Sequence, residues 1–326
     1  MTSRWTEQDI PDQTGRVAVI TGANTGVGFQ IARALAGRGA VTVLACRDPR
    51  KAADAAARIR AATPPAHVEV EELNLASLAS IHTAAKALRD RHPRIDLLIN
   101  NAGVMWQPAG RTVDGFETHL GVNHLGHFAL TGLLLDRMLG AAGSRIVTVS
   151  SPAHKQGRVD FADLQSEHRY QHMKAYAGSK LANLMFAYEL QRRLTAHAAP
   201  TGSLAAHPGG ARSELNRTMP VLFRGRHWGL ALPITHSTER GALPILRAAT
   251  DPAAEPGQYY GPDGWHEFKG WPALLASSDS SHDAEAQRRL WEESERLTGI
   301  EYSFLAGHRI PDQRPRGGDQ APRPTS

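Results

Sequence analysis

The sequence predicts an α/β fold of the doubly wound type, in which a parallel sheet is covered by helices on both faces. Short apolar runs alternate with helical segments from residue 17 to about residue 206. A glycine-rich turn separates the first apolar run from the first helix. This alternation is typical of βαβ units, whose right-handed crossovers place helices on both faces of one sheet.

Each element has its own signal in the chain. Strands are predicted at residues 17–21, 41–45, 67–73, 95–100, 146–150 and 203–206, because these runs are short, apolar and bounded by turn residues. Helices are predicted at residues 29–38, 49–62, 77–91, 115–139 and 175–197. Asp48, which precedes Pro49, and Ser77 are the expected N-caps of two of these helices.

We expect a single domain over residues 15–306, because the chain has no internal repeat and no linker between two halves. Residues 1–14 are expected to form an N-terminal arm. Residues 307–326 are rich in Pro, Arg and Gly, and we expect this tail to be disordered.

Composition and charge exclude several classes of protein. Hydrophobic residues make up 41% of the 326 residues, enough for a large core. The net charge is +5, but no basic run outside the tail is interleaved with aromatic residues, so nucleic-acid binding is not expected. No apolar run reaches the ~18 residues of a membrane span, and residues 1–16 contain no signal-peptide core. With Cys46 as the lone cysteine, we expect a cytoplasmic protein without disulfides or a membrane anchor.

Residues 21–28, Thr-Gly-Ala-Asn-Thr-Gly-Val-Gly, form the glycine-rich turn. Glycines there let the backbone approach a pyrophosphate, and the helix N-terminus offers free N–H groups and the positive end of its dipole. A tight turn that binds nothing would use glycines too, but the strand–turn–helix context favours a dinucleotide site. The expected binding residues are Gly22, Asn24, Thr25, Gly26, Val27 and Gly28.

The end of the second predicted strand bears on the choice between NAD and NADP. Enzymes that select NAD usually place an acidic residue near this point to bond the ribose 2′-hydroxyl, whereas an arginine accommodates a 2′-phosphate. Ala45 and Cys46 are not acidic, and Asp48 is better explained as a helix cap. Arg47 therefore favours NADP, with NAD as the alternative. An ordinary solvated arginine is the competing explanation.

Tyr176 and Lys180 are four residues apart in the last predicted helix, so they share one face. A free tyrosine, with a pKa near 10, is a poor acid or base at neutral pH. A cation ~4 Å away would stabilise the phenolate by ~4 kcal/mol at an effective dielectric of 20, lowering the tyrosine pKa by about three. The pair is therefore a candidate general acid/base. A tyrosine and a lysine on an exposed helical face would show the same spacing.

Five motifs in this order resemble the short-chain dehydrogenase/reductase family. They are the glycine turn 21–28, Asn-Asn-Ala-Gly at 100–103, Ser151 after the fifth strand, Tyr-x-x-x-Lys at 176–180 and Pro-Gly at 208–209. Their order and spacing match over residues 15 to about 250. Segments 119–128, 149–154 and 176–183 are similar to the branch that holds retinol dehydrogenases, WW-domain oxidoreductases and protochlorophyllide reductases. The resemblance implies a Rossmann fold.

The resemblance also implies the roles of four catalytic residues. Tyr176 would exchange a proton with the substrate oxygen, and Lys180 would lower its pKa and bond the nicotinamide ribose. Ser151, rather than its neighbour Ser150, would hold the substrate oxygen, because it stands 25 residues before Tyr176. Asn123 would complete a proton relay through water to Lys180, although a purely structural asparagine is the alternative.

Further cofactor contacts are implied in the same way. Those on the adenosine side would be Asn101, Ala102 and Gly103, and those at the nicotinamide end Pro208 and Ser213. Asn74, followed by Leu75 as a further contact, stands where the family usually has an aspartate that meets the adenine amino group. Its carbonyl can accept one hydrogen bond there, so we expect binding to persist with altered affinity.

Together these features predict an NADP-dependent oxidoreductase that transfers a hydride between the cofactor and an alcohol/carbonyl pair. One alternative is a regulator that binds the cofactor with little or no turnover. Another is an epimerase or dehydratase on the same fold, which would usually carry a Gly-x-x-Gly-x-x-Gly turn. Apolar residues in the segment 211–235 suggest a lipophilic substrate; they are Leu215, Met219, Val221, Leu222, Phe223, Trp228 and Leu230. The resemblance further implies a homo-oligomer.

Three histidines in the predicted helix 115–139 invite a metal site. They are His119, His124 and His127. No further carboxylate or cysteine ligand is suggested, and the run matches a long helix of the resembled family. We therefore predict no metal.

Overall fold

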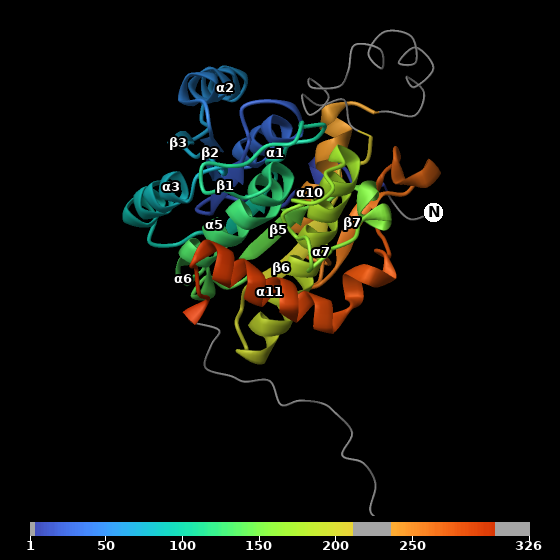
Figure 1. Ribbon diagram of the computed structural model, residues 1–326. Coiled ribbons are helices and arrows are strands. Elements are labelled where there is room, and N and C mark those ends of the chain that lie inside the picture. Colours follow the sequence, from blue (N-terminus) through green and yellow to red (C-terminus); the bar gives the residue numbers. More distant parts are fainter. Residues whose placement is uncertain (1–3, 211–235, 304–326) are drawn as a thin grey trace, which may run out of the picture.

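The computed structural model describes residues 4–210 and 236–303 and is drawn in Figure 1. Its strands are β1 (Val17–Thr21), β2 (Val41–Cys46), β3 (Val68–Glu72), β4 (Leu97–Asn100), β5 (Arg145–Val149), β6 (Gly202–Ala206), β7 (Tyr259–Pro262) and β8 (Pro272–Leu274). They form one sheet in the order β3-β2-β1-β4-β5-β6-β7-β8. Every pairing is parallel except that of β7 with β8.

Helices cover both faces of the sheet. One apolar core joins it to α1 (Gly26–Ala36), α2 (Pro49–Ala62) and α10 (Thr238–Thr250). A second core joins it to α3 (Leu78–Arg91), α5 (Gly126–Leu134) and α7 (His172–Ala196), with α11 (Ala284–Thr298) packed over α7 (Figure 1). The predicted doubly wound α/β domain is confirmed.

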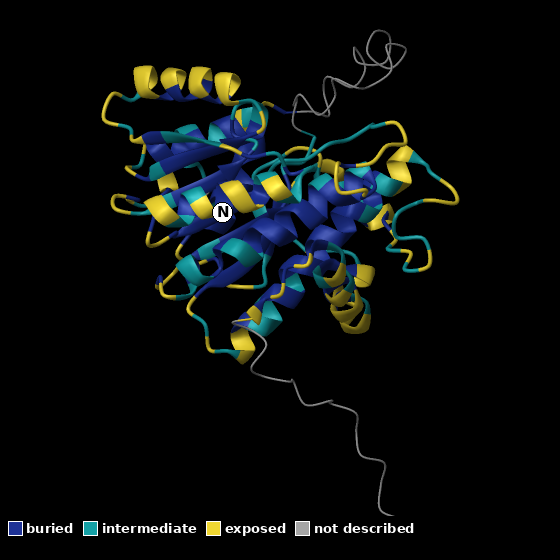
Figure 2. Ribbon diagram, turned by 60° about the vertical axis from the view of Figure 1, so that its left-hand side comes forward, coloured by how far each residue is buried: buried dark blue, intermediate teal, exposed yellow. Residues whose placement is uncertain are grey.

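Buried residues run through the sheet and the inward faces of its helices, while the outward faces are exposed (Figure 2). Trp5 and Ile10, from the segment predicted as an arm, are 8% and 1% exposed and pack into the core on the α1 side. Between them lies the short helix η1 (Glu7–Asp9). The predicted disordered tail, 307–326, lies outside the described residues. None of the described helices has the length and apolarity that a bilayer crossing requires.

Two predicted helix caps are confirmed. The Asp48 carboxylate accepts hydrogen bonds from the N–H groups of Arg50 and Lys51, both at 3.1 Å, at the start of α2. Ser77 accepts one from the N–H of Ser80 at 3.3 Å and so begins α3. These side chains satisfy N–H groups that the first helical turn leaves without partners.

The helix predicted at 115–139 starts later and is interrupted. It comprises α4 (Thr118–Leu120), a π-helical turn η2 (Gly121–Leu125), α5 and α6 (Asp136–Leu139). The start is delayed because Gly115 has a φ of 86°, outside the helical region, and the Glu117 carboxylate caps the next residues. In the π-helical turn the N–H of Gly126 bonds to the carbonyl of Gly121, five residues back. Such turns occur frequently at functional sites.

The elements after residue 206 were not predicted. Helix α10 contains an internal Pro244, which argues against a helix, and β7 ends in Gly261 and Pro262, which argue against a strand. Tertiary packing overrides both signals, because α10 is buried along the α1 face and β7 extends the sheet beyond β6.

The strand order reverses between β1 and β4, which are neighbours in the sheet. In doubly wound sheets, ligands bind outside the carboxyl ends of the strands at such a point. The glycine turn follows β1, and Asn101 follows β4. The fold therefore brings two of the predicted cofactor segments together.

Candidate active site

The glycine-rich turn joins β1 to α1 in a conformation that requires its glycines. Gly22 and Gly26 have φ angles of 67° and 59°, in the left-handed region that other side chains disfavour. At Gly28, a Cβ would lie 2.5 Å from the carbonyl oxygen of Gly22 and 2.6 Å from the side-chain nitrogen of Asn101. Thr25 makes no side-chain capping bond, so it leaves the first N–H groups of α1, at Gly26 and Val27, as donors. Close backbone approach and free N–H groups both suit a pyrophosphate.

Gly28→Ala should weaken NADPH binding by roughly 10- to 100-fold, because overpacking against backbone and an amide costs about 1–3 kcal/mol. Quenching of intrinsic fluorescence by NADPH measures the Kd. Gly140→Ala is the matched control, since a Cβ at Gly140 meets nothing within 4 Å and its φ is −89°. An unchanged Kd in Gly28→Ala would contradict the assignment of this turn.

Cys46, the last residue of β2, lies beneath the turn. Burial raises the pKa of its thiol to about 11, an effect that the N–H groups of Ala23, Asn24 and Gly22 partly oppose. The thiol therefore stays protonated at neutral pH. The sequence indicated Cys46 as evidence against disulfides and as a non-acidic residue after the second strand, and the structure places its thiol against backbone N–H groups of the glycine turn.

The predicted adenine-side residues lie beyond the ends of β2 and β3. Arg47 is exposed, and its guanidinium has no hydrogen bond or ion pair within residues 4–210 and 236–303. The side-chain oxygen of Asn74 accepts the N–H of Ala76 at 3.1 Å. This bond leaves one lone pair of the same oxygen for a further donor. Leu75 is 8% exposed, and its carbonyl would lie 2.6 Å from a Cβ placed on Gly126.

The segment after β4 is held against the end of β1. The N–H groups of Asn101 and Ala102 both donate to the Thr21 hydroxyl at 2.9 Å. The side chain of Asn101 donates to the Thr21 carbonyl at 2.8 Å. Asn101 therefore fixes the backbone where β1 turns, an organising contact that local sequence patterns cannot reveal.

Asn123 lies in the π-helical turn η2 and clamps the neighbouring segment. Its side-chain oxygen accepts from the N–H of Val104 at 2.7 Å, and its nitrogen donates to the Val104 carbonyl and to Ser179 at 3.0 and 2.9 Å. A Cβ on Gly103 would lie 3.2 Å from the Asn123 oxygen and 3.4 Å from Nζ of Lys180. The amide of Asn123 thus has a structural role here, and its part in a proton relay stays a prediction.

Tyr176 and Lys180 lie one turn apart on α7, and both are buried. The Nζ atom of Lys180 is 5.9 Å from the centroid of the Tyr176 ring and donates to the Val149 carbonyl at 3.1 Å. The Ser151 side chain is hydrogen-bonded to Tyr176. The structure thus gathers these three predicted residues at the carboxyl end of β5.

The pKa of Tyr176 shifts in the opposite direction to the one predicted from sequence. Burial raises the pKa of Tyr176, while the hydrogen bond with Ser151 acts in the opposite direction. Burial lowers the pKa of Lys180 to about 8. The predicted net lowering of the Tyr176 pKa is wrong, because desolvation of the buried phenol is the largest contribution and raises it.

The two serines after β5 have different surroundings. Ser150 is buried, and its hydroxyl donates to the Lys180 carbonyl at 2.8 Å. Ser151 is half-buried and caps the short helix η3 (Pro152–Gln156) by accepting from the N–H of Ala153 at 3.2 Å. Of these two serines, Ser151 is the one whose side chain acts on the pKa of Tyr176.

A buried polar pair supports the ring of Tyr176. His119 Nδ1 lies 3.0 Å from the Glu117 carboxylate, and its Nε2 accepts from the N–H of Gln107 at 3.4 Å. The His119 and Tyr176 rings meet edge to face with centroids 6.1 Å apart. Tyr170 donates to the Gln107 carbonyl at 2.6 Å and lies beside His119. This support was missed, because the Glu-x-His spacing resembles any pair at a helix start.

The three histidines considered as metal ligands have separate partners. His119 faces Glu117, His124 faces Ser294 at 2.9 Å and His127 faces Thr21 at 2.9 Å. Within the described ranges, no three side chains are grouped as metal ligands.

The turn after β6 is tied to the turn after β5. His207 precedes Pro208, accepts the N–H of Gly209 at 3.1 Å and lies 3.4 Å from the Glu267 carboxylate. Glu267, which ends η6 (Trp265–Glu267), also pairs with Lys155 of η3 at 2.5 Å. These contacts hold Pro208 near the segment that begins at Ser151. The predicted contact Ser213 and the whole segment 211–235 lie outside the described residues.

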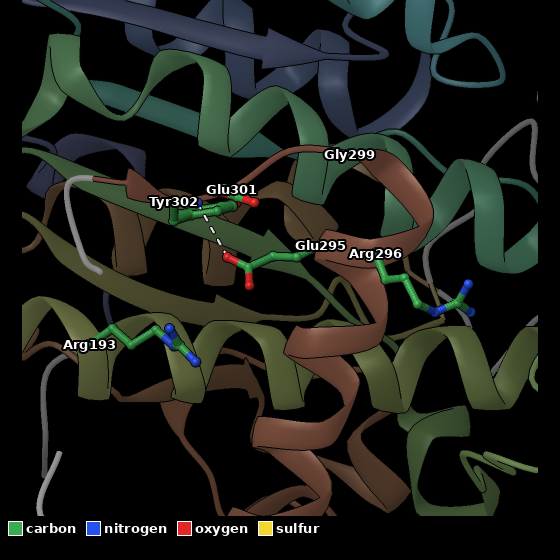
Figure 3. A pocket seen from close by; sticks show the side chains of 6 residues that line it. All are labelled: Arg193, Glu295, Arg296, Gly299, Glu301 and Tyr302. Atoms are coloured by element: carbon green, nitrogen blue, oxygen red, sulfur yellow. Dashed lines mark hydrogen bonds between the residues drawn. The ribbon is translucent and has the colours of Figure 1, made fainter. Parts of the chain in front are cut away.

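A separate pocket of ≈ 240 Å³ lies between the C-terminal parts of α7 and α11. Its lining residues are Arg193, Glu295, Arg296, Gly299, Glu301 and Tyr302. Figure 3 shows Glu295 accepting the N–H of Tyr302, at 3.2 Å. None of the predicted site residues lines this pocket, so the candidate active site is defined by the strand ends instead.

Comparison with known proteins identifies the family. A sequence model described as short chain dehydrogenase matches residues 16–219. Human retinol dehydrogenase 12 is 43% identical over 290 residues, covering 88% of each chain. Mouse polyprenol dehydrogenase is 42% identical over 296 residues, covering 89% of this chain and 86% of its own.

A solved structure gives the same result for the fold. It is that of an uncharacterised protein from Mycobacterium paratuberculosis, 42% identical, with a TM-score of 0.76. The match covers 92% of this chain and 99% of the mycobacterial one. The protein therefore belongs to the short-chain dehydrogenase/reductase family, as an NAD(P)-dependent oxidoreductase of the retinol dehydrogenase branch.

Proposed function

We propose that the protein transfers a hydride between NADP(H) and a lipophilic alcohol or carbonyl compound. The observation that carries the proposal is the meeting of Ser151, Tyr176 and Lys180 beside Gly103, next to the glycine turn. When bound, the cofactor would supply a hydride to a carbonyl carbon in reduction, or take one up in oxidation.

The side chains divide the remaining work. In reduction, the Ser151 hydroxyl holds the carbonyl oxygen, and the Tyr176 phenol donates its proton to that oxygen. The raised pKa of Tyr176 keeps the phenol protonated at neutral pH, the form that an acid requires. Lys180, charged below about pH 8, stabilises the phenolate that remains. The reverse sequence oxidises an alcohol.

Two observations support the finer assignments. The guanidinium of Arg47 is exposed beyond the end of β2, where a 2′-phosphate would lie, and Asp48 is engaged as a helix cap. The relatives named for retinol and polyprenol point to long apolar alcohols, in line with the apolar side chains among residues 211–235.

The test is NADPH oxidation against a panel of aldehydes, ketones and quinones that includes long-chain apolar members, run in parallel with NADH. We expect turnover with NADPH to exceed that with NADH, and apolar carbonyls to exceed short polar ones. Binding of NADPH without turnover of any panel member would favour a cofactor-binding regulator instead.

Arg47→Ala should raise the Kd for NADPH roughly tenfold or more, since a hydrogen bond to a charged group contributes about 1.5–3 kcal/mol. The Kd for NADH, which lacks the 2′-phosphate, should change little. Arg288→Ala, at an exposed arginine of α11 paired with Glu292, is the control. Equal losses for both cofactors, or a wild type that prefers NADH, would count against NADP.

Two further proposals concern the whole chain. We propose a homo-oligomer on the basis of the family, which light scattering after size-exclusion chromatography tests. We propose a cytoplasmic location on the basis of the lone, buried Cys46, which cell fractionation tests.

A further inference from the structure

His127 of α5 is a buried imidazole with both ring nitrogens engaged. It is 1% exposed. Its Nδ1 lies 2.9 Å from the carbonyl oxygen of Asn123, and its Nε2 lies 2.9 Å from the hydroxyl of Thr21. The ring therefore bridges the π-helical turn and the last residue of β1.

The partners fix the tautomer of this ring. A carbonyl oxygen only accepts, so Nδ1 carries the proton and donates to Asn123. Burial lowers the pKa of His127 to about 4, and the charge of Lys180 acts in the same direction, so the ring is neutral at pH 7. Its Nε2 is therefore an acceptor, and the Thr21 hydroxyl donates to it.

This donation leaves the Thr21 oxygen free to accept on its other side. It receives the N–H groups of both Asn101 and Ala102, and the only other acceptor described for its proton is the Ile99 carbonyl at 3.3 Å. The imidazole thus orients the Thr21 hydroxyl. This hydroxyl joins the end of β1, where the glycine turn begins, to the backbone of residues 101–102, and both segments are proposed to contact the cofactor.

The other ring nitrogen acts on the proton-transfer side. His127 Nδ1 bonds to the backbone carbonyl of Asn123. The side chain of Asn123 in turn bonds to Val104 and Ser179. Gly103 lies between that side chain and Nζ of Lys180. A shift of the π-helical turn would therefore move the surroundings of the lysine.

We propose that His127 is a positioning residue with two separable tasks in the hydride-transfer reaction. Its Nε2 orients Thr21 and with it the cofactor segments, and its Nδ1 holds Asn123 and with it the surroundings of Lys180. The inference rests on the proposed function above and extends it, since His127 touches neither substrate nor cofactor in this role.

Two conservative variants separate the tasks. His127→Asn keeps a donor near the position of Nδ1 and removes the acceptor for Thr21. His127→Gln places an amide near the position of Nε2 and removes the donor to Asn123. We expect His127→Asn to raise the NADPH Kd roughly tenfold and to affect kcat less, and His127→Gln to lower kcat roughly tenfold and to affect Kd less.

Thr21 provides a second, independent pair of variants. Thr21→Val removes the hydroxyl, so it should weaken NADPH binding at least as much as His127→Asn. Thr21→Ser keeps the hydroxyl and should weaken binding less than Thr21→Val. If the serine and valine variants bind NADPH equally weakly, the orienting role of His127 on this side is overturned.

His124 is the matched control for burial. It is 1% exposed, lies three residues before His127 and bonds to Ser294 of α11, away from Thr21. His124→Asn and His124→Gln should lower the melting temperature, and the two should not differ from each other in Kd or in kcat, because His124 contacts neither Thr21 nor the Asn123 carbonyl. The inference fails if the His127 variants change Kd and kcat by equal factors, or behave like the His124 variants.

Failure of the proposed function would look different. A wild type that binds NADPH but turns over nothing on the panel contradicts the reaction, while the Kd contrast between His127→Asn and His127→Gln still decides the cofactor-side task. A wild type that binds neither NADPH nor NADH overturns both proposals.

Discussion

Replacing Tyr176 by phenylalanine should lower kcat by roughly 10²- to 10⁴-fold, the usual contribution of a general acid or base, and leave NADPH binding within about twofold. The substitution removes only the hydroxyl, which is hydrogen-bonded to Ser151. The ring is 5% exposed and packs edge to face against His119, so the phenyl group keeps the same packing. Single-turnover and steady-state rates with NADPH, together with the Kd, separate chemistry from binding.

Tyr188→Phe is a closely matched control for this experiment. Tyr188 lies on the same helix, and its hydroxyl also bonds to one serine, Ser277 at 2.7 Å. Its loss should leave kcat and Kd near those of the wild type. Full turnover by Tyr176→Phe with cofactor bound would remove the tyrosine from the mechanism and with it the proposed reaction.

The sequence predicted the fold well where its signals are local. The apolar run 17–21 coincides with β1, and the capping residues Asp48 and Ser77 start α2 and α3 as expected. The signals failed where packing outweighs propensity. The π-helical turn around Asn123 is invisible to hydrophobic periodicity, and Pro244 lies inside a helix that the core stabilises.

In the active site, too, local features could be predicted from the sequence and long-range contacts could not. Tyr176 and Lys180 could be paired from sequence because an i, i+4 spacing on a helix is a local geometry. The contact between Thr21 and His127 joins residues 106 apart in the chain, so nothing local announces it. The direction of the Tyr176 pKa was also missed, because desolvation depends on the whole surrounding fold rather than on one neighbouring charge.

Lys180→Met should abolish most turnover and, at pH 7, stabilise the fold by about 2 kcal/mol. The loss of activity, roughly 10²-fold or more, follows because the variant has no positive charge to stabilise the Tyr176 phenolate. The gain in stability follows from burial. Lys180 is 3% exposed, and its pKa is lowered from 10.5 to about 8.

The sign of the stability effect comes from proton linkage. Between pH 8 and 10.5 the unfolded chain binds a proton at Lys180 that the folded chain does not, so the free energy of unfolding rises with pH there. Below pH 8 the charged lysine costs the fold about 3 kcal/mol, since each tenfold change in proton affinity is worth about 1.4 kcal/mol. Methionine removes this cost, and Val149 keeps a donor because Asn183 also bonds to its carbonyl, at 3.0 Å.

Denaturant unfolding of the wild type and Lys180→Met at pH 7 and pH 9.5 tests this account. The cost of the wild-type lysine should fall by about 2 kcal/mol between these pH values, so the advantage of the variant should nearly disappear at pH 9.5. Lys174→Met, the same substitution at an exposed position of α7, should change neither stability nor its pH dependence by more than about 0.5 kcal/mol. A variant that is less stable than the wild type at both pH values would mean that the ammonium group is held by interactions stronger than its desolvation. Lys180 would then be a structural cation, and its charge could not be described as a cost that the fold bears for catalysis.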